Sequence, residues 1–417
     1  MAFNYDQYIR GGKLPHIWCP GCTYGIVFKS LLRAVDTLKL NRDDIALVSG
    51  IGCASRLPGY VDFNTLHTTH GRALGFATGI KMAKPDKHVL VVSGDGDATA
   101  IGGNHFIHAC RRNIDITVLV FNNYIYGMTG GQYSPTTPSG HLATTMPYGN
   151  IDPSFNIPEL AKGAGASFVA RGTAYHAAGL DKLIIDAMQH KGLSVVEIMN
   201  ACPTTHGRRN KFKSPTDQLL WMKDTFIPAV AFDKLPPEKT AGKLPMGILY
   251  KKELAGVIFA EAATIFDKKT AVQSQSYGPE ARGGASKSEV IISDSTIDFP
   301  KATEIDLMLA LTPEACMKYY KDIKPDGILL VDEDFVKETP KGSFKVIRLP
   351  IIRTASEAIG KAFVANIVAI GAIAALTGQV TIEAVEKAVL SRVPKGTEEL
   401  NKRALMAGYE LAKAKVN

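Results

Sequence analysis

Cysteine is scarce in this sequence, long apolar runs are missing, and no leader segment can be recognised at its start. Six cysteines in 417 residues are too few for the disulfide framework of a small secreted scaffold. The longest apolar stretch, residues 362–377, is shorter than the ~20 residues of a membrane-spanning helix and predicts a buried helix. The first residues lack an apolar core followed by a small-residue cleavage site. We therefore expect a cytoplasmic protein with no membrane partner.

Positive charge is in moderate excess, and part of it lies in one short run. The formal net charge is +8, and residues 208–213 read RRNKFK. This run is either a solvated loop or a docking patch for an acidic electron-carrier protein, because opposite charges accelerate encounter. Nucleic acid is the weakest alternative, since the run has a single aromatic residue and no recognition motif. We expect no nucleic-acid partner.

The chain length and the pattern of apolar runs predict two α/β domains. A chain of 417 residues can form two domains with separate cores. Between residues 44 and 207, short β-rich runs alternate with helical segments such as 71–84 and 103–112. This alternation predicts a doubly wound parallel sheet. Ligands of such folds bind at the carboxyl ends of the strands.

The second half of the chain has a different organisation. Residues 1–227 form the predicted first domain, and residues 228–252, rich in proline and lysine, read as an arm or linker. A second α/β pattern covers residues 253–417, with a helix predicted near 254–266 and several β runs after it.

Polar residues follow two apolar runs of the first domain. Gly94, Asp95, Gly96 and Asp97 come after VLVVS, and Asn122–Asn123 follow VLVF. Carboxylate and amide oxygens suit Mg²⁺, while the two glycines let backbone N–H groups approach phosphate. GDG alone is equally typical of an ordinary turn. The two motifs together resemble the thiamine-diphosphate signature of the transketolase and 2-oxoacid decarboxylase superfamily. The resemblance implies that Asp95, Asn123 and the Ile125 carbonyl bind Mg²⁺.

Four of the cysteines accompany these motifs. Cys19 and Cys22 form a CxxC pair, Cys53 ends the run LVSGIGC, and Cys202 ends VVEIMNAC. Their spacing alone suits zinc, a redox disulfide or an iron–sulfur cluster. Iron–sulfur is favoured because a cluster beside thiamine diphosphate can take single electrons from it. Cys110 and Cys316 lie outside these motifs and are predicted to be small buried hydrophobic residues.

Several motifs in order resemble the β subunit of the 2-oxoacid:ferredoxin oxidoreductases over about residues 15–250. They are HIWCPGCTYG, SGIGCASRLPGY, THGRALGFATGIKMA, GDGDATAIGGNH, FNNYIYGMTGGQYSPTTP and NACPTTHGRRN. The resemblance implies that the four cysteines ligate a [4Fe-4S] cluster. It also implies a set of residues that bind the cofactors: Gly52, Cys53, His70, Gly94, Asp95, Gly96, Asp97, Asn123, Ile125, Gly127, Met128 and Thr129.

Two residues bear on the substrate. Arg56 lies where relatives that accept 2-oxoglutarate place a basic residue for the distal carboxylate, which guanidinium can bind bidentately. Met128 would line the same pocket, or belong to the core. His70 would contact the diphosphate or the reacting carboxylate, although it could simply begin a helix. We expect 2-oxoglutarate as substrate, with pyruvate or a branched 2-oxoacid as the alternative.

The resemblance implies a partner-dependent enzyme. Such an enzyme decarboxylates the 2-oxoacid oxidatively with coenzyme A and passes electrons through the cluster to ferredoxin, or catalyses the reverse carboxylation. The glutamate that activates thiamine diphosphate comes from a separate α subunit of the family. A non-redox thiamine enzyme would not need the four cysteines, and a zinc-stapled binding module would not need the GDG and NN motifs.

The second domain resembles the γ subunit of the same family, through QSQSYGPEARGGASKSEVIISD. A γ subunit opens with a strand and a glycine-rich turn before its first helix. Here GILYKKE passes directly into LAGVIFAEAAT. We therefore expect the first strand and its glycine-rich loop to be missing.

Overall fold

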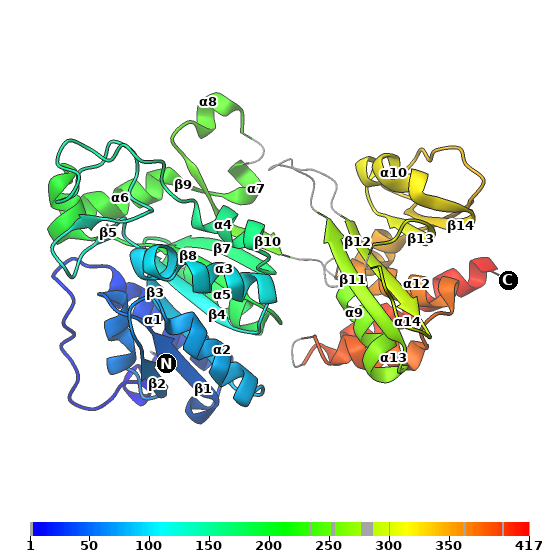
Figure 1. Cartoon of the computed structure of the whole chain (residues 1–417), viewed down its shortest axis with the longest axis horizontal. Helices are drawn as coiled ribbons and strands as arrows, with labels where there is room; N and C mark the ends of the chain where they lie inside the picture. Colours follow the sequence, from blue (N-terminus) through cyan, green and yellow to red (C-terminus); the bar gives the residue numbers. More distant parts are fainter. Residues whose placement is uncertain are drawn as a thin grey trace. The chain divides into compact units, whose positions relative to one another are not determined.

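The computed structural model describes residues 3–232, 235–251, 255–276, 287–299, 301–361, 364–393 and 396–416. The chain separates into two compact units, Met1–Lys252 and Glu253–Asn417 (Figure 1).

An eight-stranded sheet organises the first unit, in the order β2-β1-β3-β4-β8-β7-β10-β9. The strands from β2 to β7 in this order are parallel, whereas β10 runs antiparallel to β7. A two-stranded β5–β6 ribbon lies outside this sheet. The bounds are β1 Ile45–Ser49, β2 Asn64–His67, β3 His88–Gly94, β4 Thr117–Asn122, β5 Ile125–Tyr126, β6 Gln132–Tyr133, β7 Phe168–Thr173, β8 Ser194–Met199, β9 Phe226–Pro228 and β10 Leu244–Lys251. The predicted doubly wound α/β class is confirmed.

Helices cover both faces of this sheet (Figure 1). Side chains of β3 alternate between two cores, because successive residues of a strand point to opposite faces. Leu90 and Val92 pack in the core that α1 and α5 cover, and Val89 and Val91 pack in the core of α2, α3 and α4. The helices of the unit are α1 Tyr24–Thr37, α2 Ala73–Ala83, α3 Gly103–Arg112, α4 Ile157–Ala164, α5 Ala177–Gln189, α6 Pro215–Thr225, α7 Ala229–Phe232 and α8 Pro237–Thr240.

Short irregular helices follow several strands and carry candidate residues. They are η3 Ala54–Gly59, η4 Asp97–Ile101 and η5 Pro203–Gly207. The segment read as an arm, 228–252, includes α7, α8 and β10. Its strand β10 joins the sheet next to β7.

The second unit contains two separate sheets. β11 pairs with β12 in an antiparallel ribbon, and β13, β14 and β15 form a parallel sheet. In the described part of this unit no strand precedes α9. The bounds are α9 Ala255–Glu261, η6 Ala262–Phe266, β11 Thr270–Ser276, β12 Lys287–Ser293, β13 Ile305–Ala310, α10 Pro313–Tyr319, β14 Ile323–Asp332, β15 Lys345–Leu349, α11 Ile351–Arg353, α12 Ala365–Thr377, α13 Ile382–Leu390 and α14 Glu398–Val416.

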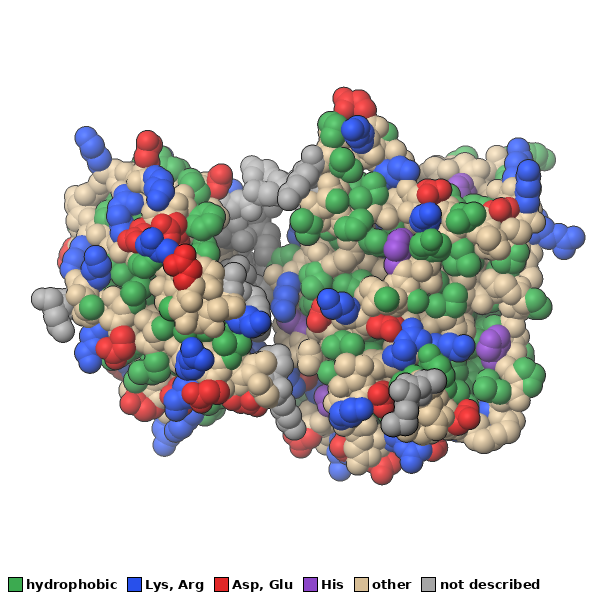
Figure 2. Space-filling view, turned by 180° about the vertical axis from the view of Figure 1, so that it is seen from behind, with side chains coloured by type: hydrophobic (Ala, Val, Ile, Leu, Met, Phe, Trp, Pro, Cys, Tyr) green, Lys and Arg blue, Asp and Glu red, His purple; other side chains and the backbone are tan. Residues whose placement is uncertain are grey.

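The apolar stretch near the C-terminus forms α12, which packs against α14 and α13. None of the helices in the described ranges combines the length and apolar character that crossing a bilayer requires. Figure 2 shows acidic and basic side chains interspersed on the visible face of each unit. The net positive charge is therefore not gathered into one large patch on that face.

Candidate functional site

Asp95 lies at the carboxyl end of β3 and is almost fully buried, with 3% of its surface exposed. Its Oδ2 accepts hydrogen bonds from Ser134 Oγ at 2.5 Å and Thr136 Oγ1 at 2.7 Å. Thr136 Oγ1 also lies 3.0 Å from Asn122 Oδ1 at the end of β4. One hydroxyl thus links the two strand ends that the sequence predicts to be neighbours. Burial raises the pKa of Asp95 to about 6, so the ionised carboxylate is unfavourable here until a cation compensates it.

Asn122, the last residue of β4, and Asn123, which follows it, have different surroundings. Asn122 donates from Nδ2 to Glu197 Oε1 at 2.7 Å and accepts the Tyr124 N–H at Oδ1. Among the described residues, Asn123 Oδ1 accepts one long hydrogen bond, from the Ile125 N–H at 3.2 Å. Tyr124, which lies between Asn123 and Ile125, adopts a φ of +65°, a conformation that non-glycine residues adopt rarely. The tight turn places the Asn123 side-chain oxygen beside the Ile125 backbone.

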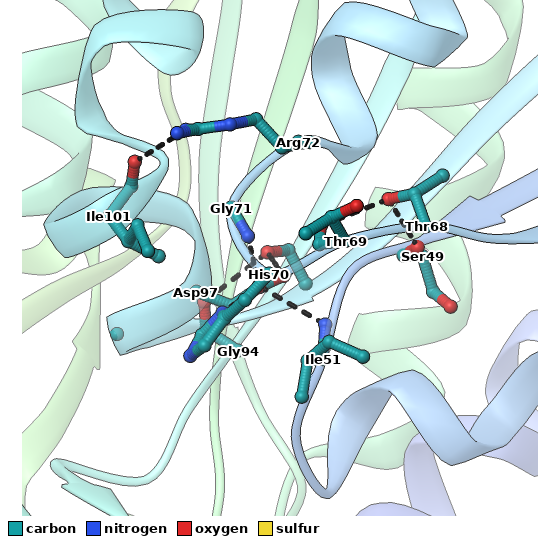
Figure 3. A network of polar contacts seen from close by, with 12 residues as sticks. Ser49, Ile51, Thr68, Thr69, His70, Gly71, Arg72, Gly94, Asp97 and Ile101 are labelled. Carbon is teal, nitrogen blue, oxygen red and sulfur yellow. Dashed lines mark hydrogen bonds and ion pairs between the residues drawn. The ribbon is translucent and has the colours of Figure 1, made fainter.

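Asp97 joins three segments at the carboxyl edge of the sheet (Figure 3). Its Oδ1 accepts from the Gly71 N–H at 2.7 Å, the Ile51 N–H at 3.2 Å and His70 Nδ1 at 2.5 Å. Its Oδ2 accepts from Ser93 Oγ at 2.5 Å. Both carboxylate oxygens are therefore bonded to the chain itself, and Asp97 holds the loops after β1 and β2 against the end of β3.

Glycines make this packing possible. A Cβ at Gly50 would lie 2.3 Å from Asp97 Oδ2, and one at Gly71 would lie 2.6 Å from the Gly102 nitrogen. A Cβ at Gly96 would lie 2.3 Å from Cζ of Tyr126, whose hydroxyl donates to the Gly96 carbonyl at 3.2 Å. By contrast, a Cβ at Gly94 would meet no atom within 4 Å. Side chains at the first three positions would push the loops apart.

His70 is oriented by Asp97 and stands at the solvent boundary. Its side chain is 33% exposed, and its ring makes an edge contact with Tyr126 at a centroid distance of 6.2 Å. Because Nδ1 donates to Asp97, Nε2 is the nitrogen left to face a ligand.

The four cysteines predicted as cluster ligands are neighbours. Cys22 interacts electrostatically with Cys202, Cys53 and Cys19, and the Thr204 hydroxyl lies 3.8 Å from the sulfurs of both Cys19 and Cys202. Burial, more than the neighbouring thiols, raises the pKa of Cys22 to about 12 and that of Cys53 to about 11. Within the described ranges, no three His, Cys, Asp or Glu side chains are set to hold a single metal ion.

Gly127 connects the cysteines with the polar residues after β4. A Cβ there would lie 3.5 Å from Cys202 Sγ, 3.6 Å from Cys53 Sγ and 3.9 Å from Asn123 Nδ2. The candidate cluster ligands and a candidate magnesium ligand therefore border the same space.

The other residues predicted to bind substrate or cofactor differ in exposure and contacts. Arg56 in η3 is exposed, and its backbone N–H donates to the Cys53 carbonyl at 3.3 Å, whereas its guanidinium has no hydrogen-bond or ion-pair partner among the residues that the structure describes. Met128 is 50% exposed, Thr129 donates to Gln132 Oε1 at 2.6 Å, and Gly52 has a φ of +127°. Cys110 and Cys316 are fully buried, as predicted.

Sequence reasoning missed Ser134, Thr136 and Tyr126, which contact Asp95 or Gly96. They follow NN in the run YIYGMTGGQYSPTTP, where no fixed spacing marks them. A cavity of about 310 Å³ opens beside Ser134 and Tyr126.

Buried His206, in η5 after Cys202, pairs with the partly buried His141. His206 Nε2 is 3.0 Å from His141 Nδ1, and burial, with a smaller effect of His141, lowers the pKa of His206 to about 3. The unfolded state has the ordinary pKa of 6.5, so it binds the extra proton first as the pH falls. The contribution of neutral His206 to the free energy of unfolding is fully present above pH 6.5. It is lost progressively as the pH falls from 6.5 to 3.

We expect this histidine to cost the first unit about 2 kcal/mol of unfolding free energy between pH 7 and pH 5. Urea unfolding can be followed by tryptophan fluorescence, because both tryptophans, Trp18 and Trp221, lie in the first unit. The loss should shrink in His206→Gln and persist in His108→Gln, whose histidine is exposed. An equal loss in all three proteins would contradict the assignment.

Comparison with known proteins assigns both units. Residues 50–198 match the family described as Thiamine pyrophosphate enzyme, C-terminal TPP binding domain. The chain is 49% identical over 243 residues to 2-oxoglutarate synthase subunit KorB of Methanothermobacter marburgensis, a match that covers 58% of this chain and 85% of that protein. The chain belongs to the 2-oxoacid:ferredoxin oxidoreductase family. The family predicted from the motifs is thereby confirmed.

Other family members agree. The KorB subunit of Archaeoglobus fulgidus is 54% identical, with 57% of this chain and 87% of that protein covered. A solved 2-oxoglutarate:ferredoxin oxidoreductase from Magnetococcus marinus, with 2-oxoglutarate, coenzyme A and succinyl-CoA bound, is 36% identical. It covers 59% of this chain and 84% of its own, with a TM-score of 0.53. Residues 253–411 match the Pyruvate ferredoxin/flavodoxin oxidoreductase family, which assigns the second unit to the same enzymes.

Proposed function

We propose that the chain is part of a 2-oxoglutarate:ferredoxin oxidoreductase. The reaction converts 2-oxoglutarate and coenzyme A to succinyl-CoA and CO₂ and delivers two electrons to ferredoxin, or runs in reverse. The observation that carries this proposal is the position of Gly127. A Cβ at this residue would lie within 4 Å of the sulfurs of Cys53 and Cys202 and of the Asn123 side chain. The proposed cluster site and the proposed thiamine-diphosphate site are therefore adjacent. This arrangement suits the oxidative decarboxylation of a 2-oxoacid, in which electrons pass from one site to the other.

The carboxyl edge of the sheet fits magnesium and diphosphate. Asp95 is a buried carboxylate whose raised pKa favours compensation by a cation, and Asn123 and Ile125, which follow the end of the neighbouring strand β4, have further oxygen atoms that suit Mg²⁺. Gly94 leaves open space for a phosphate. Thiamine diphosphate, when bound, supplies the carbon nucleophile and the electron sink for decarboxylation.

The cysteines fit a [4Fe-4S] cluster, which takes four thiolates. Their raised pKa values mean that the thiols of Cys22 and Cys53 are protonated at neutral pH in the metal-free protein. Assembly of the cluster must therefore release protons. No disulfide links these cysteines.

Arg56 and His70 are the proposed substrate contacts. Arg56 projects from η3, three residues after Cys53, and its exposed guanidinium can bind the distal carboxylate of 2-oxoglutarate. His70 presents Nε2 toward the site while Asp97 fixes Nδ1. The role of Asp97 that the contacts support is to position this loop, rather than to bind the diphosphate directly.

Two protein partners are proposed. An α subunit supplies the glutamate that activates thiamine diphosphate, and ferredoxin accepts the electrons. Arg208 and Arg209 are exposed directly after η5, the segment that begins beside Cys202. Positive charge so close to a cluster ligand suits an acidic electron carrier.

The test is anaerobic reconstitution with an α subunit of the family and reduction of a low-potential dye by 2-oxoglutarate, pyruvate or 2-oxoisovalerate, each with coenzyme A. We expect 2-oxoglutarate to be preferred. Activity with pyruvate alone would keep the family and refute the substrate, and no activity with any of the three would refute the proposed function.

We expect Arg56→Ala to lower kcat/KM for 2-oxoglutarate by about 100-fold, because a bidentate carboxylate contact is lost, and to leave the slow reaction with pyruvate nearly unchanged. The same dye assay measures both substrates. Lys84→Ala, an exposed cation on the same unit, is the control. Equal losses with both substrates would contradict a contact to the distal carboxylate.

A further inference from the structure

The sulfurs of the cysteines receive hydrogen bonds of two kinds. Cys22 Sγ accepts the backbone N–H of Tyr24. Cys202 Sγ instead lies 2.9 Å from the side-chain hydroxyl of Thr205. Only a side-chain donor can be removed without moving the backbone.

The position of Thr205 is fixed by its neighbours. It lies in η5, three residues after Cys202, and the Gly207 N–H donates to the Cys202 carbonyl at 2.8 Å. A Cβ at Gly131 would lie 3.1 Å from Cβ and 3.3 Å from Cγ2 of Thr205. The close Gly131 backbone and the short η5 loop therefore hold the hydroxyl on the sulfur.

Thr204 is a weaker neighbour. Its hydroxyl lies 3.8 Å from the sulfur of Cys202 and 3.8 Å from that of Cys19, and its side chain is exposed. Water competes for such a contact, whereas the Thr205 hydroxyl is partly shielded and much closer.

We propose that the Thr205 hydroxyl raises the reduction potential of the cluster by donating a hydrogen bond to the Cys202 thiolate. This inference rests on the proposed function, because it requires the cluster. A ligating cysteine is a thiolate and can only accept, so the hydroxyl must be the donor. Adding an electron makes the cluster and its sulfurs more negative, which strengthens a hydrogen bond to them. The bond therefore stabilises the reduced cluster more than the oxidised one.

The experiment is a redox titration of the anaerobically reconstituted full chain, followed by low-temperature EPR of the reduced cluster. Thr205→Val removes the hydroxyl at nearly constant shape. We expect its cluster to be about tenfold harder to reduce at a fixed potential, which is roughly 59 mV for one electron. Thr205→Ser keeps a hydroxyl and should titrate like the unmodified chain, and Thr204→Val should shift less than Thr205→Val.

Iron and acid-labile sulfide are measured first in each protein. Absence of a cluster from the unmodified chain would overturn the proposed function, whereas a normal cluster with equal midpoint potentials in all variants would overturn the role of Thr205 alone. A shift in Thr205→Ser as large as that in Thr205→Val would also overturn it. If Thr205→Val does not hold iron, Thr205→Ala removes the hydroxyl with less bulk, and the same comparison applies.

Discussion

Asp95→Asn should reduce turnover of the reconstituted enzyme by at least about 100-fold and at the same time stabilise the metal-free chain. The activity falls because the only carboxylate among the three proposed magnesium ligands is lost, a larger change than the 10- to 100-fold cost of altering an outer-shell partner. The stability rises because burial raises the pKa of Asp95 to about 6. At pH 7 the folded chain therefore carries an ionised, buried carboxylate, and this buried charge destabilises the folded state.

The direction of the stability change follows from proton binding to Asp95 in the folded and unfolded chains. Between pH 3.8, the ordinary value, and pH 6 the folded chain binds the proton that the unfolded chain has released, so stability falls as the pH rises through this range. The asparagine amide avoids this loss and still accepts from Ser134 and Thr136. We expect a gain of about 1–3 kcal/mol at pH 7 in urea unfolding with a chelator present. A less stable variant with full activity would contradict both parts.

Asp97→Ala should have the opposite effect on stability. Removal of this carboxylate leaves the Ile51 and Gly71 N–H groups, His70 Nδ1 and the Ser93 hydroxyl without their acceptor. Each buried donor left unpaired costs about 1–3 kcal/mol. We expect the first unit to lose about 3–5 kcal/mol of unfolding free energy, since partial relaxation recovers some of the sum.

Asp97→Asn is the matched comparison with Asp95→Asn. One carbonyl oxygen remains for the N–H groups, but the negative charge that strengthens these bonds is gone, so a loss of about 1–3 kcal/mol is expected. Tryptophan fluorescence in urea measures all three variants in the same unit. If Asp95→Asn and Asp97→Asn changed stability in the same direction and by the same amount, the distinction between the two carboxylates would fail.

The sheet was predictable to the extent that its strands are apolar. The runs predicted at 45–50, 88–96, 116–123 and 194–201 contain β1, β3, β4 and β8, which are buried on both faces and are therefore almost continuously hydrophobic in sequence. β7 was missed because it contains Arg171, which is neutralised within the fold by Glu197 at 2.6 Å. β2 was missed because it is a short, largely exposed edge strand.

The candidate site was predictable only through motifs at strand ends. GDG, NN and the cysteines lie where the parallel topology brings strand ends together, so their proximity follows from the alternating pattern. The loop contacts do not follow from it. The role of Asp97 in holding two loops against the end of β3 depends on the path of the chain after β1 and β2. The hydroxyls of Ser134, Thr136 and Thr205 reach their partners through irregular loops with no periodic signal.

The most direct test of the account is whether a 2-oxoacid reduces the chain's own cluster. The chain is reconstituted with iron and sulfide, combined anaerobically with an α subunit, and observed by low-temperature EPR after addition of 2-oxoglutarate, with and without thiamine diphosphate. We predict about four irons and four sulfides per chain and a reduced-cluster signal that requires both thiamine diphosphate and 2-oxoglutarate. A chain that binds zinc in place of iron and sulfide, or a cluster that stays oxidised with every 2-oxoacid, would contradict it.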